Sequence, residues 1–364
     1  MTSASGNKHF DSIGGEFSLG ADDFLKPETN VGVLRPDKKN HLFLDTGRSA
    51  IYVALLSIIQ QGGKKEAWLP RYCCQSVLQP FQALGYKINY YSLGIDLKTP
   101  SDLPSKLDGE TFFFIHYFGK RNRNILNYLA RMKKEFRFFV IEDCVQALLN
   151  RNLGTHDFVV NSYRKFLPQP DGALLASDLP LAGHCLQPAD ETFVSSRLIG
   201  KLIRPWRNDE LCLDLFSQAE RIIDNFGGPR EMSYLSRFLL TRTDILSIAE
   251  KRRDNFFYLL GALNSLAIDH DLIHPLFDSL EVEEVPLGLP VVVNPNYRDK
   301  LRIFLKSHKI YCPIHWPLKI EKSASWENEL LLSCSLLTLP LDQRLDHSAL
   351  DYLVEKIHGF VRLR

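Results

Sequence analysis

The chain lacks the features that mark membrane-spanning, secreted and nucleic-acid-binding proteins. None of its apolar runs approaches the roughly 18 consecutive residues that a membrane-spanning helix needs. Residues 1–17 contain no apolar stretch able to serve as a signal peptide. The 44 basic and 43 acidic residues give a formal net charge of +1, so no strongly basic face is implied. We therefore expect neither a nucleic-acid partner nor a membrane partner.

Cysteine is scarce and follows no metal-binding pattern. The seven cysteines are an odd number and show no repeated ligand spacing. Cys73 and Cys74 are adjacent, and adjacent side chains in a strand or helix point apart. The simplest interpretation is a cytoplasmic protein with reduced thiols and no metal site.

Size and composition indicate a globular protein with more than one core. Hydrophobic residues make up 45% of the chain and charged residues 24%, which is ordinary for a folded protein. We find no internal repeat and no low-complexity segment. A chain of 364 residues exceeds the usual size of one hydrophobic core, so we expect two domains, or one large domain with an appendage.

Short apolar runs alternate with helical patterns through the first half of the chain. This alternation is typical of an α/β fold with a mostly parallel central sheet covered by helices. Polar residues follow five of the runs, and ligands of such sheets bind at the carboxyl ends of the strands. We predict strands at 43–44, 67–70, 87–91, 111–116, 138–142, 158–160 and 173–176, and helices at 50–60, 74–84 and 124–136.

Beyond about residue 180 the alternation stops. Residues 190–253 are helix-rich and charged, and one helical pattern continues from 234 to 263. We predict a large domain over 1–245, including an N-terminal arm, and a smaller α+β domain over 246–364. In the smaller domain we expect strands at 281–293 and 309–316 and a final helix at 347–361.

A lysine follows the strand predicted at 158–160. Lys165 lies three residues after Ser162 and shortly before a turn that contains proline and glycine. A lysine in a surface loop would fit this fragment equally well. If the side chain is buried, desolvation lowers the pKa of its ammonium group and makes the amine a nucleophile toward an aldehyde. The hypothesis of a buried, Schiff-base-forming Lys165 therefore needs partner residues elsewhere.

One candidate partner follows the strand predicted at 138–142. Asp143 comes at the end of this buried strand, and Gln146 lies three residues further on. A simple helix cap is the alternative interpretation. Pyridoxal phosphate needs a carboxylate to keep its pyridine nitrogen protonated, and Asp143 could supply it. Gln146 could then donate to the ring hydroxyl or cover the ring face.

A second candidate partner is the turn before the helix predicted at 50–60. Gly47 would let the backbone approach an anion, and the N-terminus of a helix offers free N–H groups with a favourable dipole. The turn could hold the cofactor phosphate, with help from Arg48 or Ser49 and from Ser162 of the lysine loop. Turns of this kind are common before helices, so the signal is weak alone.

These motifs, in this order, resemble the DegT/DnrJ family of nucleotide-sugar aminotransferases, which are fold-type I pyridoxal-phosphate enzymes. The nearest match is VIEDCVQA at 140–147, and DTGRSAIYVALLSI at 45–58 is similar to the family's phosphate-binding turn and helix. Further similar segments are GGEF at 14–17, the stretch 68–93, FIHYFGK at 114–120, the lysine loop, residues 230–233 with the helix after them, HWP at 315–317 and LTLPLDQRL at 337–345.

The resemblance implies the fold-type I transferase fold and pyridoxal 5'-phosphate as cofactor. It carries the Schiff-base lysine onto Lys165, the ring-nitrogen aspartate onto Asp143 and the family's glutamine onto Gln146. The implied reaction transfers an amino group from an amino acid donor to a keto substrate such as a nucleotide-linked sugar. The implied assembly is a homodimer with shared active sites, through residues 230–234.

The sequence also departs from the family pattern. The run FLPQPDGA at 166–173 is shorter than the family's glycine-rich run and contains proline, and Arg48 could bind a substrate carboxylate instead of phosphate. The usual ring-stacking aromatic falls near Tyr72 or Cys74. If it falls at Cys74, Tyr72 or His116 must cover the ring.

Two alternative functions stay open. One is another pyridoxal-phosphate reaction on a small amino acid, because many chemistries share this fold. The other is a catalytically inactive regulatory or scaffold subunit. The joint presence of Lys165, Asp143 and Gln146 argues against the second alternative.

Overall fold

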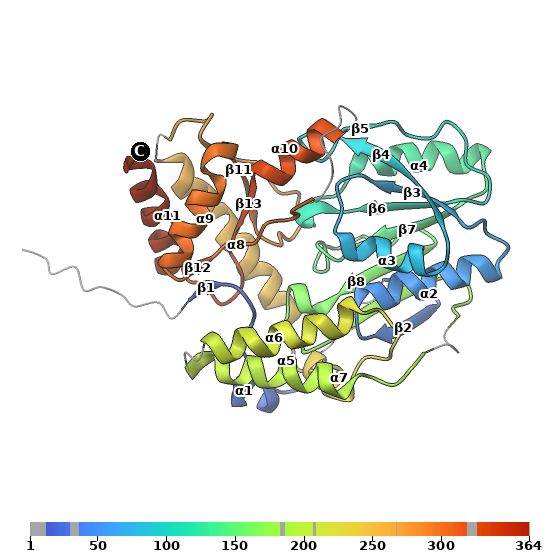
Figure 1. Ribbon diagram of the computed structural model, residues 1–364, viewed down its shortest axis with the longest axis horizontal. Helices are drawn as coiled ribbons and strands as arrows, with labels where there is room; N and C mark the ends of the chain where they lie inside the picture. Colours follow the sequence, from blue (N-terminus) through green and yellow to red (C-terminus); the bar gives the residue numbers. More distant parts are fainter. Residues whose placement is uncertain are drawn as a thin grey trace, which may run out of the picture.

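The computed structural model describes residues 12–29, 36–182, 186–206, 209–266, 268–318 and 326–363. Its largest element is an eight-stranded sheet, which occupies the right half of Figure 1. The strand order is β2-β9-β8-β7-β6-β3-β4-β5. The strands are β2 (Asn40–Leu44), β3 (Glu66–Pro70), β4 (Lys87–Leu93), β5 (Pro100–Ser101), β6 (Thr111–Ile115), β7 (Phe139–Asp143), β8 (Phe158–Ser162) and β9 (Ala173–Ser177).

Five adjacent strands of this sheet, β8, β7, β6, β3 and β4, run parallel. β9 lies antiparallel between β8 and β2, and β5 is antiparallel to β4. A parallel strand covered on both faces is buried along its length, as β6 and β8 are. The prediction of a mostly parallel central sheet is confirmed.

Three helices connect the first strands: α2 (Gly47–Gln60), α3 (Gln75–Ala83) and α4 (Arg123–Glu135). α2 begins where the side chain of Thr46 accepts a hydrogen bond from the backbone of Ser49, a typical N-cap. α2 packs along β7, β8 and β9. The packing fixes the N-terminus of α2 beside the carboxyl ends of these strands.

The left half of Figure 1 is built on a separate antiparallel sheet of order β10-β11-β13. Its hydrophobic core is distinct from that of the large sheet and draws mainly on residues 256–357. The elements of this half are α8 (Ile245–Asn264), β10 (Ile273–Pro275), β11 (Leu289–Val293), α9 (Pro295–Ser307), β12 (Ile310–Tyr311), α10 (Glu327–Ser335), β13 (Leu336–Leu339) and α11 (His347–Arg362).

Two further groups of elements lie between or below the two sheets. The short strand β1 (Ile13–Gly14) pairs in parallel with β12, so residues near the N-terminus join the half formed by residues 245–362. α1 (Ala21–Leu25), α5 (Glu191–Ile203), α6 (Asp209–Asp224) and α7 (Tyr234–Leu240) lie along the lower side of Figure 1. None of the helices in the described ranges is both long and apolar enough to cross a bilayer.

The sequence predictions beyond residue 180 are less accurate. The helical pattern at 234–263 is divided between α7 and α8, because Asp244 caps a new helix by accepting from the backbone of Ser247. The strand predicted at 281–293 covers only 289–293. Three glutamates of its first part, at 281, 283 and 284, instead form ion pairs with Arg123, Arg121 and Lys120. The strand predicted at 309–316 is reduced to β12.

Candidate active site

The carboxyl ends of the parallel strands meet at one cavity of about 230 Å³. The chain passes from β4 to β6 across β3, so the strand order reverses between β3 and β6, and such switch points are the usual ligand sites of open α/β sheets. The cavity lining includes six of the predicted site residues, namely Gly47, Arg48, Asp143, Gln146, Ser162 and Lys165, together with Thr46, Cys74, Glu220, His315 and Trp316.

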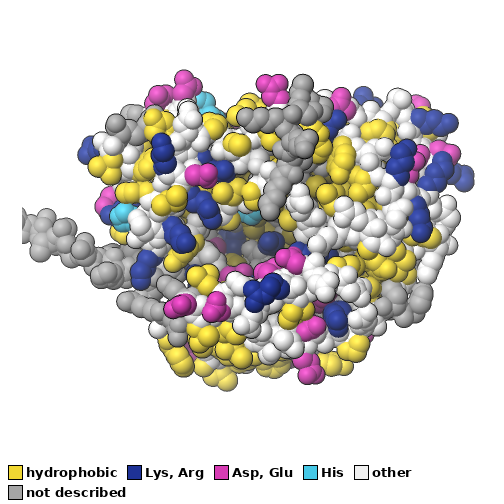
Figure 2. Space-filling view, viewed as in Figure 1, with side chains coloured by type: hydrophobic (Ala, Val, Ile, Leu, Met, Phe, Trp, Pro, Cys, Tyr) yellow, Lys and Arg dark blue, Asp and Glu magenta, His cyan; other side chains and the backbone are white. Residues whose placement is uncertain are grey.

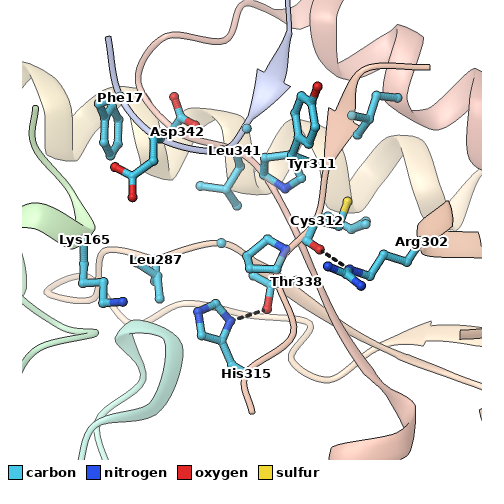
Figure 3. Close-up of a pocket in the computed structure, with 18 of the residues that line it drawn as sticks. Phe17, Lys165, Leu287, Arg302, Tyr311, Cys312, His315, Thr338, Leu341 and Asp342 are labelled. Atoms are coloured by element: carbon cyan, nitrogen blue, oxygen red, sulfur yellow. Dashed lines mark hydrogen bonds between the residues drawn. The ribbon is translucent and has the colours of Figure 1, made fainter. Parts of the chain in front are cut away.

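Lys165 lies in a single 3₁₀ turn, η3 (Tyr163–Lys165), directly after β8. Its side chain lines the 230 Å³ cavity and also a second, larger cavity beside it. Figure 3 shows its amine pointing into this larger space, toward Leu287 and His315. The prediction of a buried, desolvated lysine is wrong for the single chain, because η3 places the side chain at the boundary of two open cavities, where it is exposed.

Asp143 ends β7 and is 4% exposed. Its Oδ1 accepts a hydrogen bond from the backbone N–H of Val145 at 2.8 Å. Burial raises the pKa of this carboxyl to about 7, although the hydrogen bond and the charge of Lys165 act in the opposite direction. Within the described chain no cation forms a direct ion pair with Asp143, so it is a buried carboxyl on the cavity whose one charged neighbour, Lys165, acts from a distance.

The turn before α2 lies across the cavity from β7. Gly47 lines the cavity, and a Cβ placed on it would meet only the Val145 Cγ2 atom, at 3.7 Å. The guanidinium of Arg48 donates to the carbonyl of Ile223 and, at 2.8 Å, to Asp224. The charge of Arg48 is therefore already engaged by α6, and the backbone N–H groups of the turn are the donors left for an anion.

The remaining polar candidates take different positions. Gln146 is buried beside the cavity, and its Oε1 accepts from the backbone of Phe118 at 2.7 Å, which orients its amide. Ser162 lines the cavity at the end of β8. Ser49 does not line it, because its hydroxyl lies beneath the turn, in contact with Thr46 and with the backbone of Arg230.

Tyr72 and His116, both predicted to cover a cofactor ring, are outside the lining of this cavity. The Tyr72 hydroxyl donates to the carbonyl of His315 and accepts from the backbone N–H of Trp316 at 2.9 Å. His116 is fully buried and pairs through Nε2 with Glu142 at 3.0 Å. Both residues are therefore held in the wall behind the cavity.

His116 belongs to a hydrogen-bonded cluster centred on Glu142. This carboxylate also accepts from Gly154 and contacts the Nδ1 of His156 at 3.0 Å. Burial would raise the pKa of Glu142, but the two histidines outweigh it and hold that pKa well below its ordinary value. Potential ligand atoms of His116, Glu142 and Cys144 lie within 4.8 Å of one another, and hydrogen bonding to Glu142 explains this proximity.

The second cavity, of about 680 Å³, lies between the two halves of the molecule. Figure 2 shows a hollow near the centre of the face, with lysine or arginine side chains inside it. Its lining comes from the arm around β1, the lysine turn, α8, α9 and the strands β12 and β13. Five cationic residues line it, namely Arg164, Lys165, Arg252, Arg302 and Lys306.

Only Arg164 among these five cations forms an ion pair with a carboxylate of the described residues, with Glu220 at 2.7 Å. The buried Arg252 donates to two backbone carbonyls and to Gln343, and burial lowers its pKa to about 10. Arg302 donates only weakly, to the carbonyl of Cys312 at 3.4 Å. Two carboxylates, of Glu16 and Asp342, also line the larger cavity, but they form ion pairs with Arg197, Lys201 and Arg344, which are outside the lining. The lining therefore carries more positive than negative charge.

Sequence reasoning missed Glu220 and the cations of the larger cavity. Glu220 is 56 positions from Arg164, and its ion pairs with Arg164 and Arg197 arise only when α6 packs over the lysine turn. Arg252 and Arg302 stand in ordinary charged helices whose sequence gives no functional signal. For the segment after β12, the HWP motif at 315–317 was the sequence signal that it reaches the site.

Comparison of the coordinates with solved structures shows the fold. DesV of S. venezuelae, solved with a ketimine intermediate, matches with a TM-score of 0.63 and 16% identity over 95% of this chain and 91% of its own. The aminotransferase TlmJ from Streptoalloteichus hindustanus matches with a TM-score of 0.65 and 15% identity, covering 97% of this chain and 100% of its own. A DegT DnrJ EryC1 StrS aminotransferase from Brucella abortus matches with a TM-score of 0.58 and 14% identity, over 94% and 91%.

The sequence itself matches no family model and no curated protein. At these identities the likeness concerns the fold. The chain has the fold of these aminotransferases, the fold-type I transferase architecture, and the predicted fold class is confirmed.

Proposed function

We propose that the protein is a pyridoxal-phosphate-dependent aminotransferase that moves an amino group from an amino acid to a keto sugar. The observation that carries the proposal is one cavity lined by Lys165, by the buried carboxyl of Asp143 and by the helix-start turn at Gly47. An amine, a carboxyl and a set of free backbone donors are the three groups that this cofactor needs. The shared fold with three aminotransferases supports the same conclusion.

The residues present fit pyridoxal 5'-phosphate. Gly47 leaves open space where any other side chain would project, so a phosphate can approach the backbone at the N-terminus of α2. Ser162 lies on the same cavity as an additional hydroxyl donor. Asp143 is a buried carboxyl without an ion-pair partner among the described residues, and a protonated ring nitrogen would supply one.

Bound pyridoxal phosphate supplies the electron sink for reaction at the Cα of the amino donor. Lys165 Nζ is the amine that holds the cofactor covalently and, once released, the base that moves the proton from Cα. Asp143 keeps a proton on the ring nitrogen. Gln146, oriented by the backbone of Phe118, holds the polar edge of the ring.

The larger cavity supports an anionic keto substrate, such as a nucleotide-linked sugar. Arg252, Arg302 and Lys306 face it, and none has a carboxylate partner in the described part of the chain. Guanidinium and ammonium groups bind phosphate oxygens through charge-assisted hydrogen bonds. Lys165 lies on both cavities, so a sugar held by its phosphates would present its keto carbon beside the amine.

We expect the double substitution Arg302→Ala and Lys306→Ala to raise KM for a nucleotide-linked keto sugar roughly a hundredfold, at about tenfold for the charge-assisted contact that each residue makes. The kcat should change little, because neither side chain lies on the cofactor cavity. Steady-state kinetics with the charged sugar and with an uncharged keto sugar measure the effect. Lys300→Ala, on the exposed side of α9, is the matched control. Equal KM effects on both sugars would contradict the prediction.

We also propose a cytoplasmic homodimer. The described cysteines are all free thiols, as a reducing compartment favours. Figure 2 shows hydrophobic side chains gathered along the lower edge of the molecule, where α5 and α6 lie in Figure 1. Large exposed apolar patches commonly mark protein interfaces. The exposed apolar residues of these helices and their neighbours are Leu25, Ile199, Trp206, Leu211, Leu213, Tyr234, Phe238 and Leu246.

The substitutions Trp206→Asp and Tyr234→Asp should each weaken self-association roughly thirtyfold, because buried aromatic residues dominate interface energies. These side chains are 81% and 87% exposed in the single chain, so its own fold should tolerate the change. Sedimentation equilibrium measures the dissociation constant. Val282→Asp, at a side chain 90% exposed elsewhere on the surface, is the control and should leave association unchanged. A monomeric wild-type protein would refute the dimer.

The proposed reaction is tested on the purified protein with pyridoxal phosphate added. Visible absorbance and irreversible trapping by borohydride report a covalent link to Lys165. A screen of amino acids for conversion of the cofactor to its pyridoxamine form then tests transamination. Conversion by a donor supports the aminotransferase, whereas a trapped cofactor that no donor converts would favour another pyridoxal-phosphate reaction.

A further inference from the structure

Position 74 has no aromatic ring to offer a cofactor. Cys74 lines the 230 Å³ cavity just before α3, and its sulfur accepts a hydrogen bond from the hydroxyl of Ser76 at 3.0 Å. Tyr72, the nearest aromatic residue in sequence, lies in the wall behind the cavity. At this position the chain therefore provides a small thiol, where the family resemblance predicts an aromatic ring that stacks on the cofactor.

An indole reaches the same cavity from a distant part of the sequence. Trp316 lines it together with Lys165, Asp143 and Cys74, although it lies more than 240 positions after Cys74. Its ring packs at 5.6 Å from the ring of Tyr72 and at 6.1 Å from the ring of Tyr117, measured between centroids. Trp316 is thus the cavity-facing member of a group of three aromatic rings.

Tyr72 fixes the backbone that carries this indole. Its hydroxyl donates to the carbonyl of His315 and accepts from the N–H of Trp316 at 2.9 Å, so the carbonyl and the N–H of one peptide unit are both held. Tyr117 in turn donates from its hydroxyl to the carbonyl of Tyr72. Tyr72 is fully buried, which protects these hydrogen bonds from competition by water.

We propose that Trp316 supplies the aromatic surface against the cofactor ring, in place of an aromatic residue at position 74, and that Tyr72 is the positioning residue that holds it there. This inference rests on the proposed function, because it requires pyridoxal phosphate in the 230 Å³ cavity. An indole beside a small thiol gives the ring a flat apolar contact and leaves room for it. The cofactor then contacts both halves of the molecule, since Trp316 belongs to the segment after β12.

The first test measures the affinity of the cofactor-free protein for pyridoxal phosphate. Trp316→Ala should raise Kd roughly tenfold, the loss expected for one aromatic contact, whereas Trp316→Phe should stay within about threefold of wild type. Trp326→Ala is the matched control, because that indole packs on Tyr90 and is absent from both cavities. An unchanged Kd for Trp316→Ala would overturn the proposal.

The second test uses tryptophan fluorescence and does not depend on activity. Subtracting the emission of Trp316→Phe from that of wild type gives the fluorescence of Trp316 alone. Binding of pyridoxal phosphate should quench most of this fluorescence. Tyr72→Phe should weaken this quenching and raise Kd several-fold. Tyr91→Phe, which removes another buried tyrosine hydroxyl that bonds to the carbonyl of Phe113, should do neither.

The outcomes separate the two proposals. If wild type binds no pyridoxal phosphate, the proposed function fails and this inference fails with it. If wild type forms the trapped covalent link but the Trp316 emission is not quenched, the role of Trp316 is refuted, and with it that of Tyr72, while the proposed function stands. Equal effects of Tyr72→Phe and Tyr91→Phe would refute the positioning role of Tyr72 alone.

Discussion

Replacement of Lys165 by alanine should lower the rate of amino transfer by roughly 10⁴-fold or more, because the variant loses both the covalent anchor and the base that moves the Cα proton. Lys165 is the one lysine on the cofactor cavity among the residues described, so no other side chain of this type can take over. Steady-state kinetics and borohydride trapping followed by mass spectrometry measure the two losses separately. We expect no trapped cofactor on the variant.

The side chain of Lys165 is exposed in the single chain, so the substitution should cost little stability. A thermal unfolding midpoint close to that of wild type would confirm that the loss is chemical. Lys134→Ala, at an exposed lysine of α4 that lines neither cavity, controls for the removal of a positive charge. Lys165→Arg should be equally inactive, since a guanidinium forms no Schiff base. Retained trapping in Lys165→Ala would refute the assignment.

The sequence was most informative where a property depends on local pattern. The strands between residues 43 and 177 and the helices between them follow from apolar runs, caps and turns, and the structure has each of them. The parallel topology brings three site residues to one edge of the sheet. Asp143 ends β7, Lys165 follows β8, and Gly47 begins α2. That convergence could be predicted because every parallel strand ends on the same side.

The sequence was least informative where packing between distant segments determines the position of a side chain. The exposure of Lys165 depends on a 3₁₀ turn and on two adjoining cavities, and neither leaves a local signal. Tyr72 and His116 stand beside the right strand ends, but each turns toward a partner far along the chain, His315 and Glu142 respectively. Ion pairs between Glu281–Glu284 and Lys120–Arg123 likewise replace a predicted strand by a loop.

The fold by itself does not select the reaction. The comparisons at 14 to 16% identity concern architecture, which many reactions share. What favours amino transfer here is the chemistry of the cavity, which is lined by both an amine and a buried carboxyl without an ion-pair partner among the described residues. Under the proposed function, Asp143 would destabilise the cofactor-free protein and would be needed for the reaction, and mutation can separate these two effects.

Asp143→Asn should therefore change stability and activity in opposite directions. Burial raises the pKa of Asp143 from 3.8 to about 7, so between these values the folded protein binds a proton that the unfolded chain has released. The free energy of unfolding then falls as pH rises through this window and levels off above pH 7. Each pKa unit is worth about 1.4 kcal/mol, so the penalty at pH 8 is at most about 4 kcal/mol.

Asparagine removes the ionisation but can keep the hydrogen bond from Val145. Urea unfolding of the cofactor-free proteins should show the variant more stable than wild type by 1 kcal/mol or more at pH 8, with the difference shrinking toward pH 4. With cofactor, kcat should fall roughly 10²- to 10⁴-fold, because the ring nitrogen loses the carboxylate that keeps its proton. Asp108→Asn, at an exposed side chain, should change neither quantity. A variant that is less stable at pH 8 but fully active would refute both the buried charge and its catalytic use, since a carboxylate that the cofactor does not need would leave turnover untouched.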